Sequence, residues 1–155
     1  MISDSSPLIF LSKIGKLSLL KDLFREITIP TSVKDEILVE EKPEANTIKM
    51  GLEEKWIKIV DPKKILELNL GKGESHAISL ALEKKDSLII DDQKAIRAAE
   101  ALNVDILRTT SIIFIALKNK KIDKKEALEL VNSLIKNGYY LAPKYYLEIV
   151  EKLTE

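Results

Sequence analysis

Residues 87–102, SLIIDDQKAIRAAEAL, contain the pattern that decides the fold. They begin with a short apolar run that ends at two consecutive acids, Asp91 and Asp92. Small and apolar residues then recur three and four positions apart, from Ala95 to Leu102, which is the period of one helix face. A buried strand followed directly by a helix is the unit from which parallel sheets are built.

The same alternation extends outward along the whole chain. Amphipathic helical stretches separate short apolar runs, which lie at Ile2, 27–29, 56–60, 87–90 and 104–107. This pattern predicts an α/β fold with a central, mainly parallel five-stranded sheet and helices on both faces. Because there is no internal repeat and no linker-like segment, residues 1–155 are predicted to form a single domain.

Helix starts are predicted to gather along one edge of the sheet. Right-handed crossovers place each strand's carboxyl end beside the amino end of the following helix. Ser6, before Pro7, and Ser32, after Pro30, are predicted to cap two of these helices. Open α/β sheets bind their ligands along this edge, so the functional residues are expected there.

Composition excludes several classes of chemistry. The 155 residues include no Cys and one His, which rules out disulfides, Cys-zinc sites, thiol catalysis and two-histidine mechanisms. Twenty-five basic and 25 acidic residues give zero net charge, so bulk charge does not indicate a strongly basic nucleic-acid binder. No apolar run is long enough to span a membrane, and the acid at position 4 is untypical of a secretion signal, so a cytoplasmic protein is expected.

Four acids map to the predicted binding edge. Asp4 and Asp92 follow the first and fourth strands, while Glu36 and Glu74 lie near helix starts. Singly, each is an ordinary helix-start acid. Together, crowded carboxylates must either have raised pKa values or be neutralised by a cation such as Mg²⁺. The chemistry that remains is therefore carboxylate catalysis with or without a metal ion.

Other features favour structural roles. The Gly-Lys-Gly at 71–73 lacks the longer phosphate-loop pattern and is predicted to be a turn, and His76 has no triad partners nearby. The lysines of residues 118–125 are typical of a solvated turn, with phosphate contact as the alternative. Helix packing is favoured over base stacking for the tyrosines at positions 139, 140, 145 and 146.

Four motifs carry a resemblance to a known family. They are Ser3–Ile9 (SDSSPLI), Ile29–Ile37 with its Glu36, Gly73–Ile78 (GESHAI) and Leu88–Arg97 (LIIDDQKAIR). Their order and spacing resemble those of PIN-domain nucleases. The likeness is strongest to a PIN-like prokaryotic subfamily of unknown function that is related to VapC-type toxins.

The resemblance implies a three-layer α/β/α sandwich and a function. Family members hydrolyse RNA phosphodiesters with Mg²⁺ or Mn²⁺, often as the toxin of a toxin–antitoxin pair and commonly as a homodimer. It therefore implies RNA as the substrate, a small antitoxin protein and a second copy of the chain as partners, and no membrane.

The same resemblance assigns roles to the acids. Asp4, Glu74 and Asp92 would hold the metal ion, with Glu74 standing where many members carry Asp. Glu36 would position the ion or its water, which makes these four the catalytic set.

Three further residues are implied to support that set. Ser6 matches a hydroxyl position and would steady Asp4 or a metal-bound water. Asp91 would cap or support its neighbour. Thr109 opens a hydroxyl-rich stretch after the fifth strand, although the Gly expected nearby is absent.

Two alternatives remain open at this point. A catalytically inactive PIN-like module could bind RNA or a protein partner, with its acids as remnants. A receiver-type phosphoacceptor domain also uses an acidic pocket, but it is disfavoured because the acid pair follows the fourth strand rather than the first.

Overall fold

A computed structural model describes residues 1–39 and 41–155. These residues form nine helices and five strands, in the following order. The elements are β1 (Ile2–Ser3), α1 (Ser5–Lys13), α2 (Ser18–Phe24), β2 (Ile27–Ile29), α3 (Thr31–Val39), α4 (Pro43–Glu53), β3 (Ile57–Ile59), α5 (Lys72–Lys84), β4 (Leu88–Ile89), α6 (Gln93–Ala101), β5 (Ile106–Leu107), α7 (Thr109–Lys118), α8 (Lys124–Lys136) and α9 (Pro143–Thr154).

The five strands form one sheet in the order β3-β2-β1-β4-β5, and every neighbouring pair is parallel. Ile2 of β1 pairs with Thr28 on one side and Leu88 on the other. The predicted five-stranded parallel sheet is therefore confirmed. From β1 the chain adds β2 and β3 toward one edge of the sheet, and it then adds β4 and β5 toward the other edge. The strand order therefore reverses between β1 and β4. Ligands of open α/β sheets bind at such a reversal.

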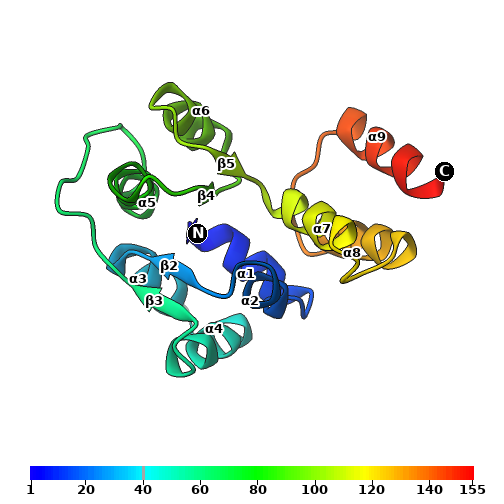
Figure 1. The fold of residues 1–155 in the computed structure, drawn as a ribbon, viewed down its shortest axis with the longest axis horizontal. Helices are drawn as coiled ribbons and strands as arrows, with labels where there is room; N and C mark the ends of the chain where they lie inside the picture. Colours follow the sequence, from blue (N-terminus) through cyan, green and yellow to red (C-terminus); the bar gives the residue numbers. More distant parts are fainter. Residues whose placement is uncertain (40) are drawn as a thin grey trace.

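Helices cover both faces of the sheet (Figure 1). On one face, α1 packs against α4 and α7, and α2 also contacts α7. On the other face, α5 lies over β1 and β4 and contacts α6. Right-handed crossovers explain why the helices lie on two faces. The chain moves across the sheet in one direction up to β3 and in the opposite direction afterwards, so the later connections cover the other face. Helix α9 packs on α8 and lies at one end of the molecule (Figure 1).

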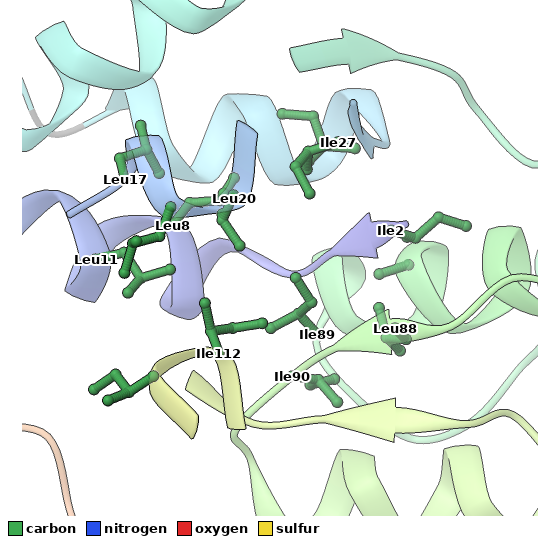
Figure 2. Packing of buried hydrophobic residues seen from close by; sticks show 14 of the residues in the cluster. Ile2, Leu8, Leu11, Leu17, Leu20, Ile27, Leu88, Ile89, Ile90 and Ile112 are labelled. Atoms are coloured by element: carbon green, nitrogen blue, oxygen red, sulfur yellow. The ribbon is translucent and has the colours of Figure 1, made fainter. Parts of the chain in front are cut away.

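The strands are two or three residues long, yet both faces of the central strands β1 and β4 are buried. Leu88 and Ile89 are adjacent in β4 and point to opposite faces, and neither is exposed to solvent. Figure 2 shows Leu8 and Leu11 of α1 and Ile112 of α7 pointing into the same interior space. This double-sided burial fixes the position of the ends of β1 and β4, and therefore of the acids that follow them.

Two predicted helix caps were wrong. Helix α1 begins at Ser5 with Asp4 in the cap position, two residues earlier than a Ser6 cap would give. Helix α3 begins at Thr31, whose N–H and hydroxyl both donate to the Asp61 carboxylate at 2.7 Å. A side chain 30 residues away thus satisfies the start of α3, which local sequence does not reveal. These hydrogen bonds lower the pKa of Asp61.

The predicted strands at 56–60 and 104–107 are shorter in the structure, at Ile57–Ile59 and Ile106–Leu107. Within the described ranges, no helix has the length and apolar character needed to cross a bilayer.

Candidate active site

Asp4 lies at the centre of the carboxyl edge of the sheet. Its backbone N–H donates to the Ile89 carbonyl at 2.9 Å, which locks it between β1 and β4 where the strand order reverses. The residue is 5% exposed, and its Oδ1 has no hydrogen-bond partner among the described residues. A buried carboxylate oxygen without a partner is costly, so it calls for a proton or a cation.

Burial raises the pKa of Asp4 to about 7. The backbone amide of Ser5 opposes this increase, while the negative charges of Glu36, Glu74 and Asp91 add to it. Carboxylates from three other elements therefore act on Asp4. Glu36 and Glu74 were predicted to crowd Asp4 and do act on it, whereas the third charge is that of Asp91 rather than of the predicted Asp92.

Glu36 joins three helices at this edge. Its Oε2 accepts from the Ser5 hydroxyl at 2.9 Å, and its Oε1 accepts from the Gly73 backbone N–H at 3.1 Å. A Cβ at position 73 would lie 2.7 Å from Glu36 Cδ, closer than carbon atoms pack, so only glycine allows this approach. Residues 71–73, predicted as a turn, instead cap and begin α5, and Gly73 serves as a binding point for Glu36.

Glu74 and Asp92 lie at the starts of two different helices, and Asp92 acts electrostatically on Glu74. Glu74 is in the first turn of α5, and Asp92 caps α6 by accepting from the Ala95 N–H at 2.9 Å. Burial raises the pKa of Glu74, and the charges of Asp92 and Glu36 raise it further, while Lys94 opposes them. Glu74 therefore lies between the two aspartates electrostatically, since it acts on Asp4 and is acted on by Asp92.

Asp91 anchors the neighbouring segments to β4. Its carboxylate accepts from the Thr109 N–H at 2.9 Å, the Thr109 hydroxyl at 2.6 Å and the Tyr139 hydroxyl at 2.7 Å. The Tyr139 ring packs edge-on against Phe10 at 5.2 Å, and burial followed by the charge of Asp91 raises the pKa of this tyrosine. Tyr139 therefore remains a hydrogen-bond donor. The sequence offered helix packing for Tyr139 and gave no sign of this bond, which spans 48 residues.

The five acids are crowded but do not form a closed cage. None of the ion pairs in the described part of the chain involves any of them. In that same part, no three Asp, Glu or His side chains are close enough to hold a metal ion as they stand. The donor chemistry nevertheless fits a hard divalent cation, because the buried unpaired oxygen of Asp4 faces a field made only of carboxylates.

Comparison with known proteins identifies the family. The DUF3368 family model, described as a PIN domain, matches residues 1–155. The chain belongs to the PIN-domain family. No curated protein matches it. Among solved structures, a PilT N-terminus domain protein, SSO1118, from the hyperthermophilic archaeon Sulfolobus solfataricus P2 is similar, with a TM-score of 0.57 and 23% identity over 76% of this chain and 94% of that one.

The family match confirms the predicted PIN-domain family. The similarity to the solved structure, at 23% identity, supports the predicted fold alone. It also makes the receiver-type alternative wrong, because the PIN-domain match covers the whole chain.

A cleft of about 910 Å³ opens beside the acids of this PIN domain. Its lining joins Ser6, Asp91 and Asp92 to the 138–142 segment and to one side of α9. Ser6 thus lies next to the site, as the resemblance implies. Helix α9 contributes a wall of a cleft that no motif in the sequence indicated.

Two other candidates lie away from the acids. The lysines at 118–125 are exposed at the turn after α7, about 15 Å along that helix from Thr109. His76 acts electrostatically on Asp61 rather than on the site acids of the PIN domain. Neither one contributes to this edge.

Proposed function

We propose that this PIN domain is a metal-dependent ribonuclease that hydrolyses phosphodiester bonds of single-stranded RNA. The observation that carries the proposal is Asp4, a buried carboxylate with an unpaired oxygen in a field of carboxylates. Family membership supports it, because PIN domains are commonly nucleases. Carboxylate oxygens are the ligands that hard divalent cations such as Mg²⁺ and Mn²⁺ prefer, and no basic side chain pairs with these acids in the described residues.

Asp4, Glu74 and Asp92 would hold the ion. When bound, a divalent cation lowers the pKa of a water and offsets the charge that develops on the phosphate. Glu36 is fixed by Ser5 and Gly73, so its position is set before substrate arrives.

Asp91 plays a positioning part in the same proposal. It directly precedes Asp92, and its three hydrogen bonds hold the end of β4 in place. Asp92 also caps α6, and the Ala95 N–H donates to its Oδ2, which orients the carboxylate. Preorganised groups of this kind cost little reorganisation during the reaction.

Cleavage of a labelled single-stranded RNA with and without Mg²⁺ or Mn²⁺ tests the proposal. Asp4→Asn and Asp92→Asn should each lower kcat by about 100-fold or more, since loss of groups that merely orient a metal ligand already costs 10- to 100-fold. Exposed Asp105→Asn is the matched control and should leave cleavage unchanged. Equal cleavage by wild type and both site variants would refute the nuclease proposal.

One observation favours a second candidate, a PIN-like module that binds RNA or a protein without catalysis. The site acids in the described residues do not form a preformed metal cage. Melting the protein in a Mn²⁺ series separates the two, because a ligand that binds only the folded state raises its stability. No change in Tm up to millimolar Mn²⁺ would support the non-catalytic module. An antitoxin partner and a homodimer stay predictions from the family resemblance.

A further inference from the structure

We propose that the cleft beside Asp91 and Asp92 binds an unpaired nucleobase of the RNA, next to the phosphate that is cleaved. The inference rests on the proposed ribonuclease function and adds a substrate subsite to it. The cleft is continuous with the acid edge, since both acids contribute to its lining. A base in the cleft therefore belongs to a nucleotide that adjoins the reacting phosphate.

Aromatic rings are concentrated around this cleft. The chain contains four Tyr, three Phe and one Trp, and five of these eight residues line it. They are Phe10, Phe114, Tyr139, Tyr140 and Tyr145. Aromatic faces bind bases by stacking and do so with little regard to sequence, which suits recognition of single strands.

Four of the five rings divide into two pairs, while Phe114 is partly buried against the core. Phe10 and Tyr139 pack against each other edge to face, and Tyr139 is 6% exposed. In contrast, Tyr140 and Tyr145 are 83% and 57% exposed. The packed pair, buried Tyr139 and half-buried Phe10, therefore builds the wall, while the exposed pair has free ring surface available to a base.

Charged side chains at the cleft suit a nucleotide as well. Arg108 is oriented by a 2.7 Å hydrogen bond from its Nη2 to the Gln93 side-chain oxygen, and it lies in the lining with Lys152. Both can contact phosphates that flank the base. Gln93 and Glu148 also line the cleft and offer groups that can hydrogen-bond to base edges.

The dimensions and the location favour a nucleobase over a protein helix. A volume of about 910 Å³ falls within the range of small-molecule sites, which is roughly 300–1,000 Å³. One side of the cleft is made by α9, which buries only Ile149 and Leu153 among the described residues. Duplex RNA has no free base faces, so this cleft would select single strands.

Binding of a single-stranded RNA carrying 2-aminopurine tests the proposal directly. The Asp4→Asn background prevents cleavage, and the fluorescence of 2-aminopurine falls when it stacks. Tyr145→Ala should weaken RNA binding by roughly 5- to 150-fold, the fold-change expected from loss of one stacked base. Leu147→Ala, on the same helix but outside the cleft lining, should change the Kd by less than about twofold.

Abasic RNA provides the second arm. If Tyr145 stacks on a base, removing that base should make Tyr145→Ala and the Asp4→Asn parent bind alike. Tyr140→Ala repeats the test at the other exposed ring. The proposal is overturned if Tyr145→Ala and Leu147→Ala bind intact RNA equally, or if binding leaves 2-aminopurine fluorescence unchanged. Either result would mean that the cleft does not bind a base, and would favour a protein partner as its occupant.

The two proposals fail in different ways. If wild type shows no metal-dependent cleavage but the tyrosine variants still weaken base-dependent binding, the nuclease function fails and the base site stands. If cleavage is intact and insensitive to Tyr140→Ala and Tyr145→Ala at subsaturating RNA, the base site fails and the nuclease function stands.

Discussion

Replacing Asp4 with Asn should stabilise the metal-free protein above neutral pH while it removes activity. In the unfolded chain this carboxyl ionises near its ordinary pKa of 3.8, whereas in the fold its pKa is raised to about 7. Between those values the folded state binds an extra proton, so stability falls as pH rises. Above pH 7 the folded protein carries the full cost of a buried, unpaired charge, which Asn does not carry.

The gap of about three pH units corresponds to about 4 kcal/mol at 1.36 kcal/mol per unit, which is a ceiling. An amide at the same place still has buried polar atoms, so we expect a gain of roughly 1–3 kcal/mol. For a chain of this size, 1 kcal/mol shifts Tm by about 2–4 °C. Asp4→Asn should therefore melt roughly 2–12 °C above wild type at pH 8.

Thermal melting in EDTA at pH 4.5, 6 and 8 measures this effect. The difference in Tm should be smallest at pH 4.5, where about a quarter of the ceiling is already reached, and largest at pH 8. Asp105→Asn, an exposed control, should follow wild type throughout. Millimolar Mn²⁺ should then raise the Tm of wild type but not that of Asp4→Asn. An Asp4→Asn variant that melts below wild type at pH 8 without metal would refute the reasoning.

Two further substitutions test how the acids are held. Gly73→Ala should expel the Glu36 carboxylate and lower kcat by about 10-fold. Tm should hold or rise, because alanine has a higher helix propensity than glycine. A Gly73→Ala variant with full activity would show that Glu36 needs no fixed position. Tyr139→Phe should lose the 2.7 Å hydrogen bond to Asp91, lower stability by about 1–2 kcal/mol and slow cleavage by roughly 10-fold. Urea unfolding and cleavage rates check both effects, and unchanged values would remove Tyr139 from the support of the site.

The acids were the part of the site that sequence could predict. Asp4 and Asp92 follow buried strands, and Glu74 follows a helix start, so the rules of parallel sheets place them at one edge. In the structure Glu74 acts electrostatically on Asp4, and Asp92 acts on Glu74. The contacts that hold them were not predictable, because Glu36 meets Gly73 across 37 residues and Asp91 meets Tyr139 across 48.

The alternation of short apolar runs and helical stretches by itself determined a parallel α/β sheet and the edge where the acids gather. That information is local, because each βα unit carries its own strand and helix periodicity. The right-handedness of crossovers also holds for each unit separately. Only the tertiary structure decided that Asp4 is buried with an unpaired oxygen, and that α9 forms a cleft lined by exposed tyrosines. These features depend on how distant helices dock, and side-chain packing across the whole chain fixes that docking.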